Sequence, residues 1–242
     1  MTVLEPAAGS IIGHYSFDSS ANADIGGLNL VPDVNAPEQV AGKLGNAYRF
    51  DATNDENLVA PNNTDYAFGD ETFCVRFWMQ IHDKPSGYNP IIGRYNLDSK
   101  REWGVSWSSN GTLSFGVSSN GTTRTSANYV TLAIDTWYHV VVWHDPVANV
   151  IGLRVNDSTQ SLISWSNGVF DSTEPFKIGS APGTSVEEYS NITIDDLVIL
   201  NNYILSAEQI TADYNGGDGL SAGDWAPAGG PLISKTSVGV SI

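Results

Sequence analysis

The stretch ITIDDLVILNNYILSAEQITADYNGG, residues 192–217, decides the fold class. Its first half is an apolar run typical of a buried strand, and its second half carries the capping pattern of a short helix. Asp195 and Asp196 stand side by side inside the apolar run. They could form a catalytic pair, a metal site or a solvated strand edge, and the rest of the sequence has to narrow these alternatives.

The second half of this stretch predicts one short helix near the end of the chain. Ser206 is the expected N-cap, and Gln209 three residues later completes a capping box. Leu205 and Ile210 occupy the positions of a hydrophobic staple, and Gly216-Gly217 is expected to end the helix. We expect this helix to pack on the edge of the domain and to take no part in chemistry.

Upstream, a period-two alternation typical of strands recurs along the chain. In TFCVRFWMQIH, residues 72–82, every second residue from Phe73 to Ile81 is apolar, which predicts one buried face. Asn110-Gly111 and Asp145-Pro146 each separate two such runs and predict hairpin turns. About ten or more short strands at this spacing predict an all-β sandwich or barrel.

Composition narrows the classes of partner. The 242 residues carry 11 Lys and Arg against 27 Asp and Glu, a formal net charge of −16. Such a chain repels phosphate backbones and anionic lipids, so we expect neither nucleic acid nor membrane insertion. Cys74 is the single cysteine, which excludes an intrachain disulfide and predicts a buried free thiol. No secretory signal is visible at the start, and the expected location is extracellular or on a virion surface.

The character of the sequence changes after Gly219. Residues 220–242 are rich in Gly, Ala, Pro and Ser, so the predicted division is a β-sandwich domain at 1–219 and a C-terminal arm at 220–242. The arm is either a disordered tail or a segment whose end, Val238, Val240 and Ile242, adds a strand to the sheet edge of another chain.

The order of the motifs resembles a laminin G-like domain of the concanavalin A-like lectin/glucanase superfamily. The resemblance covers about residues 10–217, and it implies a jelly-roll β-sandwich of two antiparallel sheets with one short C-terminal helix. It rests on GHYSFDSSANADIGG, GKLGNAYRFDATNDENLVAP, ETFCVRFWMQI, TWYHVVVWHDPVANVIGLRVND, FKIGS and IDDLVILNNYILSAEQITADYNGG, in this order.

The resemblance also implies a structural calcium site. In this family the aspartate of the closing strand, here Asp195, and one in the first turn, here Asp24, often help to hold Ca²⁺, and Asp18 and Asn22 are close enough in sequence to contribute. The alternative is that Asp195 accepts hydrogen bonds from backbone N–H groups where the first and last strands meet. Asp196 is expected to point to the opposite face and to be solvated.

Catalysis is not expected. Glucanases of this fold place carboxylates at alternate positions of one strand, whereas adjacent residues such as Asp195 and Asp196 should point to opposite faces. His139 in WYHVVV is expected to be a hydrogen-bonded, largely buried histidine. Glycoside hydrolysis is therefore kept only as a less favoured alternative.

A non-catalytic binding role remains, and a glycan or another cell-surface structure is the expected ligand. Sugar recognition needs aromatic rings and planar polar groups. A phage decoration or fibre protein, held to other virion proteins or to copies of itself by residues 220–242, is the alternative; deletion after Gly219 would then abolish attachment, whereas a free lectin would tolerate it. The ligand-contact candidates are Arg94, Tyr95, Trp107, Trp165 and Tyr189, with Tyr88 and Tyr129 as further members of the set.

Overall fold

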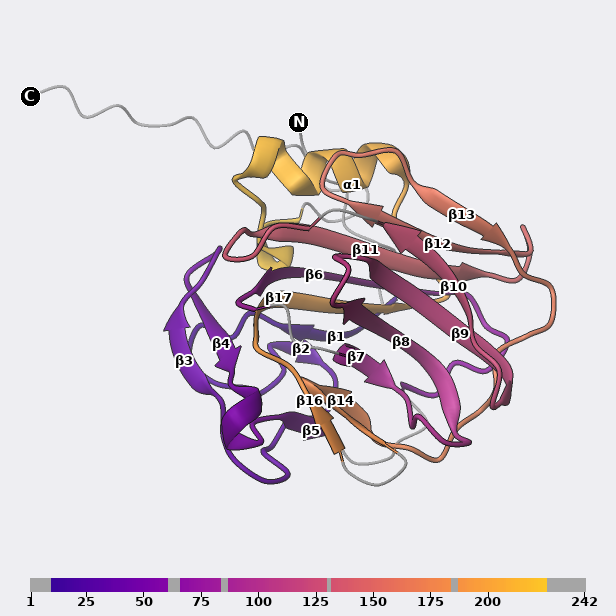
Figure 1. Cartoon of the computed structure of the whole chain (residues 1–242). Helices are drawn as coiled ribbons and strands as arrows, with labels where there is room; N and C mark the ends of the chain where they lie inside the picture. The colour runs from indigo at the N-terminus through magenta and orange to yellow at the C-terminus, as the bar shows by residue number, and fades with distance from the viewer. Residues whose placement is uncertain (1–9, 61–65, 84–86, 130–131, 184–186, 226–242) are drawn as a thin grey trace, which may run out of the picture.

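The structure, a computed structural model, describes residues 10–60, 66–83, 87–129, 132–183 and 187–225. Within these residues the strands form a nine-stranded sheet, a six-stranded sheet and a two-stranded ribbon. Figure 1 shows the two larger sheets packed together, with the helix α1 (Ala207–Tyr214) lying across the outside of the sandwich. The all-β sandwich of antiparallel sheets with one short C-terminal helix is therefore confirmed.

The nine-stranded sheet is built around β17 (Ile192–Asn201), which is the apolar run of residues 192–217. β17 pairs with β6 on one side and with β1 and β4 on the other, so segments from both ends of the chain meet there. All of these pairings are antiparallel. The strands are β1 (Ile11–Tyr15), β2 (Ile25–Gly26), β3 (Glu38–Ala41), β4 (Asn46–Phe50), β6 (Phe73–Ile81), β11 (Tyr138–Asp145), β12 (Val150–Val155), β13 (Ser161–Ser164) and β17 (Ile192–Asn201).

The six-stranded sheet has the order β10-β9-β8-β7-β14-β5. The hairpin between β8 and β9 turns at Gly111, whose φ of +88° is the left-handed conformation that the Asn-Gly pair predicts. The strands are β5 (Leu58–Ala60), β7 (Tyr88–Arg94), β8 (Arg101–Ser108), β9 (Leu113–Gly121), β10 (Thr125–Tyr129) and β14 (Phe176–Ile178), and the ribbon consists of β15 (Ser180–Pro182) and β16 (Glu187–Tyr189).

The main core lies between the two sheets. As the alternation predicts, β6 contributes every second residue from Phe73 to Ile81 to this core. β8 supplies Trp103, Val105 and Trp107 from the opposite sheet. Side chains alternate along a strand, so Gly104 and Ser106, which lie between these residues, face outward.

A second, smaller core forms on the outer face of the nine-stranded sheet, under α1 (Ala207–Tyr214). The predicted capping box of Ser206 and Gln209 is confirmed, and Asn215, in the left-handed region at φ +50°, ends the helix just before the predicted Gly-Gly pair. The short 3-10 helices are η1 (Ala52–Asn54), η3 (Asn215–Gly217) and η4 (Ala222–Asp224). The second core consists of Cys74, Val141, Trp143, Val198, Leu200, Leu205, Ile210, Ala212, Ala222 and Trp225.

The division predicted at Gly219 needs a correction, because residues 220–225 belong to the folded domain. Leu220 N–H donates to the Asp213 carbonyl at 3.0 Å. The Trp225 side chain is 4% exposed, and its Nε1–H donates to Asp213 Oδ1 at 3.1 Å. The sequence did not predict this, because residues 220–225 belong to a stretch rich in Gly, Ala, Pro and Ser. Their attachment depends on one tryptophan and on partners elsewhere in the chain. The remaining arm, residues 226–242 with its predicted final strand, lies outside the described residues.

None of the helices in the described part of the chain has the length and apolar character needed to cross a membrane.

Candidate functional site

The two adjacent aspartates lie on the same side of β17. The register of β17 against β6 shifts between Asp195 and Val198, which places one extra residue in β17, and Asp196 has a φ of +43°. Ile194 and Leu197 both point into the main core, so the two aspartates between them both miss it. This β-bulge cancels the alternation that predicted opposite faces.

Asp196 is buried rather than solvated, which corrects the expectation from sequence. Its exposed fraction is 1%, and it binds Arg76 Nη1 and His14 Nε2, the latter at 2.7 Å. Arg76 also binds Asp213 through Nε at 2.6 Å and Nη2 at 2.7 Å. His139 Nε2 lies 2.8 Å from Asp213 Oδ2, which confirms the predicted buried, hydrogen-bonded histidine.

We call Arg76, Asp196, Asp213, His14 and His139 the Arg76 network. Burial alone would raise the pKa of Asp213, but the Arg76 guanidinium and His139 lower that pKa to about 2. Burial opposes ionisation of Asp196 as well, and Arg76 with His14 lowers its pKa below the usual range. Both carboxylates are therefore fixed charges that tie α1 and the C-terminal segment to the sheet.

Asp195 is held differently, by the turn between β3 and β4. Its Oδ2 accepts the backbone N–H of Leu44 at 2.8 Å, so Asp195 does accept a backbone hydrogen bond, but from this turn rather than from the place where the first and last strands meet. Its Oδ1 is buried and has no hydrogen-bond partner among the described residues. Burial raises the pKa of Asp195 to about 7, and the neighbouring Asp196 adds to the rise.

The other residues of the predicted calcium site also bind backbone groups. Asp24 Oδ2 accepts Ser16 N–H at 2.6 Å, and Asp18 Oδ1 accepts Asn46 N–H at 2.9 Å. Among the described residues, no three His, Cys, Asp or Glu side chains are grouped so that they could hold a metal ion. Within the described residues, Asp18, Asp24 and Asp195 are therefore not grouped around one point, and Asn22 donates its backbone N–H to Ser20 Oγ at 3.2 Å. A calcium ion held by fewer carboxylates and by backbone carbonyls stays a prediction.

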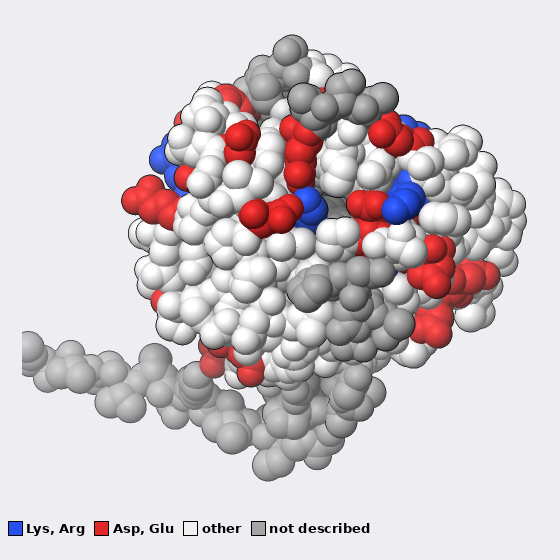
Figure 2. All heavy atoms as spheres, turned by 90° about the horizontal axis from the view of Figure 1, so that it is seen from below, with Lys and Arg blue, Asp and Glu red and all other residues white. Residues whose placement is uncertain are grey.

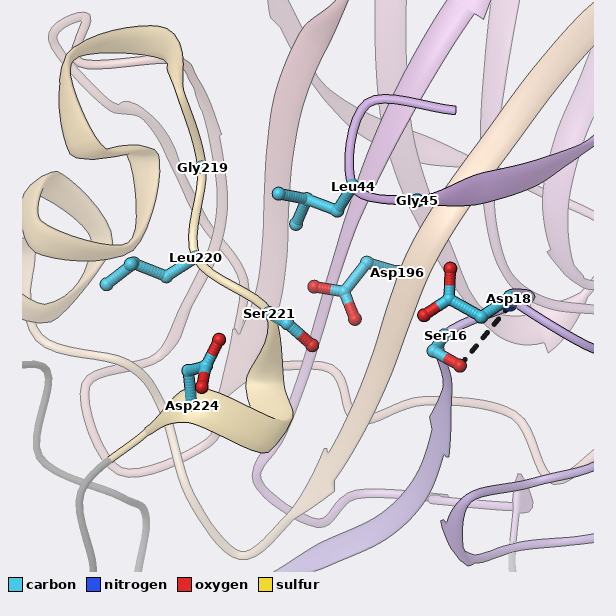
Figure 3. Close-up of a pocket in the computed structure, with 9 residues that line it drawn as sticks. All are labelled: Ser16, Asp18, Leu44, Gly45, Asp196, Gly219, Leu220, Ser221 and Asp224. Carbon is cyan, nitrogen blue, oxygen red and sulfur yellow. Dashed lines mark hydrogen bonds between the residues drawn. The ribbon is translucent and has the colours of Figure 1, made fainter. Parts of the chain in front are cut away.

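Asp18 and Asp196 line a pocket of about 290 Å³ between the turn after β1 and the C-terminal segment. Figure 3 shows Asp18, Asp196 and Asp224 around this opening, with Leu44 and Leu220 on its sides. Asp196 is already bound to Arg76, and Asp18 to the backbone of Asn46. The pocket therefore lies where the turn after β1, the β3–β4 turn and the C-terminal segment meet beside β17.

Replacing Asp195 by asparagine is expected to reduce the pH dependence of stability between about pH 4 and 7. The pKa of Asp195 is raised from 3.8 to about 7 in the folded protein, so its contribution is full below pH 4 and is lost as the pH rises towards 7. Urea unfolding of the wild type and the variant at pH 4.5 and 7.5 measures this. Between these pH values the free energy of unfolding of the wild type should fall more than that of the variant, by at most about 4 kcal/mol. Equal pH slopes would contradict the burial argument.

If calcium binds at Asp195, the melting temperature of the wild type will be higher in calcium than in EDTA, whereas that of the Asp195→Asn variant will be the same in both.

The predicted ligand-contact residues are not brought together. Trp107 is 2% exposed and points into the main core, and Trp165 Nε1–H donates to the Gly168 carbonyl at 2.8 Å. Arg94 is buried and its Nε lies 2.8 Å from Glu102 Oε2. Tyr189 lies half-buried on β16. The expectation is wrong for Trp107 and Arg94, because alternation places one in the core and a buried glutamate satisfies the other.

Tyr95 instead belongs to a cluster on the outward side of the six-stranded sheet. Tyr88 and Tyr95 stack with ring centroids 5.9 Å apart and planes at 17°. The Arg124 guanidinium lies 6.0 Å from the Tyr88 centroid and 5.7 Å from that of Tyr95, and Arg101 lies 5.8 Å from Tyr95. We call Tyr88, Tyr95, Arg101 and Arg124 the Tyr–Arg patch.

Small residues on β8 and β9 make room for this patch. A Cβ added at Gly116 would lie 1.9 Å from Arg124 Nε, whereas a Cβ added at Gly104 would meet Tyr95 at an ordinary 3.4 Å. Arg124 Nη2 donates to the carbonyls of Gly104 at 3.3 Å and Ser114 at 3.2 Å. The alternation of large inward and small outward residues on these strands thus supports a flat surface of aromatic and guanidinium planes.

The patch contrasts with the charge of the remaining surface. Figure 2 shows a face on which acidic side chains are far more numerous than basic ones, in keeping with the net charge of −16. The Tyr–Arg patch contains two arginines and no carboxylate. Sequence reasoning named both tyrosines but missed Arg101 and Arg124, which lie at the start of β8 and just before β10.

Fold and topology define a β-sandwich of the concanavalin A-like type. The sequence profile described as the Concanavalin A-like lectin/glucanases superfamily, of the laminin G type, matches residues 51–211. The chain belongs to this superfamily. No match is found among curated protein sequences.

Solved structures with a similar fold include two toxin domains and one domain of an enzyme. The binding domain of Botulinum Neurotoxin DC in complex with SialylT has a TM-score of 0.64 and 15% identity, over 86% of this chain and 52% of that one. The binding domain of Paraclostridial Mosquitocidal Protein 1 has a TM-score of 0.67 and 13% identity, over 86% and 52%. Domain 4 of AbnA, a GH43 extracellular arabinanase from Geobacillus stearothermophilus, in complex with arabinotriose, has a TM-score of 0.64 and 15% identity, over 84% and 97%. The chain spans about half the length of the toxin domains, and at these identities the likeness establishes a shared fold.

Proposed function

We propose that this protein is a non-catalytic glycan-binding module and that the Tyr–Arg patch is its binding surface. The observation that carries the proposal is the stacked pair Tyr88 and Tyr95, with Arg124 over both rings, on an outward sheet face. Aromatic rings and planar donors are the groups with which proteins recognise sugars.

The parts of the patch have distinct roles in this proposal. Tyr88 is half-buried and offers its ring to the apolar face of a sugar, whereas Tyr95 is 6% exposed and stacks against the Tyr88 ring. Polar side chains continue from the rings across the neighbouring strands: Ser106 on β8 bonds the Tyr88 hydroxyl, and Ser114 Oγ on β9 donates to Asn128 Oδ1 on β10 at 2.7 Å. The Asn128 side-chain nitrogen has no partner among the described residues, and it is a suitable donor for a sugar hydroxyl.

The ligands of the similar structures support saccharides as the ligand class, although each of those ligands belongs to the protein it was solved with. Domain 4 of AbnA was solved with arabinotriose, and a Botulinum Neurotoxin DC binding domain with SialylT. The structure of botulinum neurotoxin type C is also similar, and cell entry of that toxin depends on interaction with two ganglioside molecules. Saccharides are thus recurrent ligands on this fold, and we carry only that class over to the present chain.

The state of the acidic residues favours binding over catalysis. Glycoside hydrolysis requires two carboxyl groups facing the scissile bond. Asp195 and Asp196 lie together but are buried, and Asp196 is neutralised by Arg76. Glu102 is buried beside Arg94 and accepts the backbone N–H groups of Phe68 and Ser172. We therefore expect no turnover of polysaccharides.

An extracellular or virion-surface location stays a prediction. So does attachment to other virion proteins or to further copies of this chain, because residues 226–242 lie outside the described residues.

Replacing Tyr88 by alanine is expected to weaken glycan binding about tenfold or more, since the stacking surface is lost. Tyr189→Ala is the matched control, because it removes a half-buried tyrosine from β16, outside the patch. The test begins with a glycan array on the wild type, followed by calorimetric titration of its best oligosaccharide into both variants. Thermal melting checks that both variants are folded.

Equal weakening by the two variants, or weakening by Tyr189→Ala alone, would place the site elsewhere. Absence of binding to every oligosaccharide on the array would contradict the proposed ligand class.

A further inference from the structure

The two arginines of the Tyr–Arg patch lack the carboxylate partners that most basic residues of this chain have. Five basic side chains in the described residues bind an aspartate or glutamate: Arg76, Arg94, Lys100, Arg154 and Lys177. No such pair involves Arg101 or Arg124 in the described ranges, although the chain carries 27 acidic residues. The described Lys43 and Arg49 also lack one, but they belong to the β3–β4 hairpin of the other sheet.

Neutral groups hold both guanidinium groups in place. Arg101 donates to the carbonyls of Thr122 and Leu97, and Arg124 donates to those of Gly104 and Ser114. The Nε atoms of both arginines are buried without a hydrogen-bond partner in the described part of the chain. Arg124 Nη1 likewise has no hydrogen bond among the described residues. The positions of the arginines are thus fixed while their charges remain uncompensated.

Glu102 is the one acidic side chain in the described strands β8 and β9. The outward residues of β8 and β9 beside Arg124 are glycine and serine, namely Gly104, Ser106, Ser114 and Gly116. Glu102, the acidic residue of β8, is tied to Arg94. An anion that reaches the patch therefore meets two guanidinium groups that no carboxylate of the described residues neutralises, which is what an arginine needs in order to select a carboxylate.

From these contacts we infer that the Tyr–Arg patch selects saccharides that carry a carboxylate, such as oligomers of a uronic acid, over their neutral counterparts. Arg124 binds the carboxylate, and Tyr88 binds the ring of the same sugar or of its neighbour. This inference rests on the proposed function, since it names the ligand class of the same surface.

The test compares oligogalacturonides with the same oligomers after methyl esterification, which removes the charge and keeps the sugar skeleton. Calorimetric titration should show about tenfold tighter binding of the free acid by the wild type, the effect of one charge-assisted hydrogen bond. Arg124→Gln should abolish this preference and retain binding of the ester. A second acidic series, hyaluronan oligomers against their carboxyl-reduced form, uses the same variants.

A pair of glycine variants separates the position of Arg124 from its charge. Gly116→Ala places a Cβ 1.9 Å from the present position of Arg124 Nε, so the guanidinium must move and the preference for the acid should fall. Gly104→Ala meets Tyr95 at 3.4 Å and should keep the preference. Thermal melting confirms that each variant is folded.

Equal affinity for acid and ester in the wild type, or an acid preference that survives Arg124→Gln, would overturn the inference while leaving the proposed function intact. Failure of both series and of every neutral glycan would overturn both.

Discussion

Replacing Arg76 by alanine is expected to lower the free energy of unfolding by about 3–5 kcal/mol. Arg76 is fully buried and binds both Asp196 and Asp213, so its removal leaves two buried carboxylates without their cation. It also removes the donor to the Leu220 carbonyl, which anchors the C-terminal segment. Urea unfolding followed by tryptophan fluorescence measures the loss.

Arg49→Ala is the matched control, because Arg49 is exposed on β4 of the same sheet and should cost about 0.5 kcal/mol or less. If Arg76→Ala does not fold, the triple variant Arg76→Met, Asp196→Asn, Asp213→Asn removes all three charges together and should recover a folded protein. A loss below about 1 kcal/mol for Arg76→Ala, the range of exposed ion pairs, would contradict the structural role of the Arg76 network.

Replacing Trp225 by alanine is expected to cost about 3–5 kcal/mol, as for other buried tryptophans. The Trp225 ring lies 5.6 Å from the Arg76 guanidinium, packs in the second core and donates to Asp213. Cutting the chain after Gly219 removes this ring together with the Leu220 carbonyl, so that truncation should destabilise at least as much. Thermal and urea unfolding of both variants measure the effect.

A chain cut after Trp225 keeps every described contact and should unfold like the whole protein. This cut, rather than one after Gly219, therefore isolates the role of residues 226–242. Light scattering on the whole chain and on residues 1–225 then tests whether the arm carries self-association. If the cut after Gly219 leaves stability unchanged, residues 220–225 are not part of the folded domain.

Local patterns in the sequence predicted most of the fold. The inward face of β6, the hairpin at Gly111 and the capping box of Ser206 depend on neighbours within a few residues, so alternation and turn chemistry suffice to find them. The helix ended as expected near its Gly-Gly pair, with Asn215 taking the left-handed position.

The candidate sites depended on features that alternation cannot register. One extra residue in β17 put Asp195 and Asp196 on the same side, and a bulge of that kind leaves no mark on an apolar run. The buried network of Arg76 was not predicted, because its partner Asp213 lies 137 positions further along the chain.

The Tyr–Arg patch was only half visible for the same reason. Tyr88 and Tyr95 were named for their residue type, but Arg124 reaches them from outside any predicted strand, across the small outward residues of β8 and β9. Trp107, by contrast, was predicted to contact the ligand but lies in the core. Its place beside a turn suggested exposure, whereas the alternation of β8 points it inward.

The central claim is that a saccharide binds on the outward face of the six-stranded sheet, and backbone amide chemical-shift mapping by NMR tests it most directly. Titration of the wild type with its best oligosaccharide should move the resonances of Tyr88, Tyr95, Arg101 and Arg124 and of the neighbouring residues of β8 and β9. Shifts confined to the turn after β1, the β3–β4 turn and the C-terminal segment, where the acidic pocket of Asp18 and Asp196 lies, would contradict the claim and move the site to the other sheet.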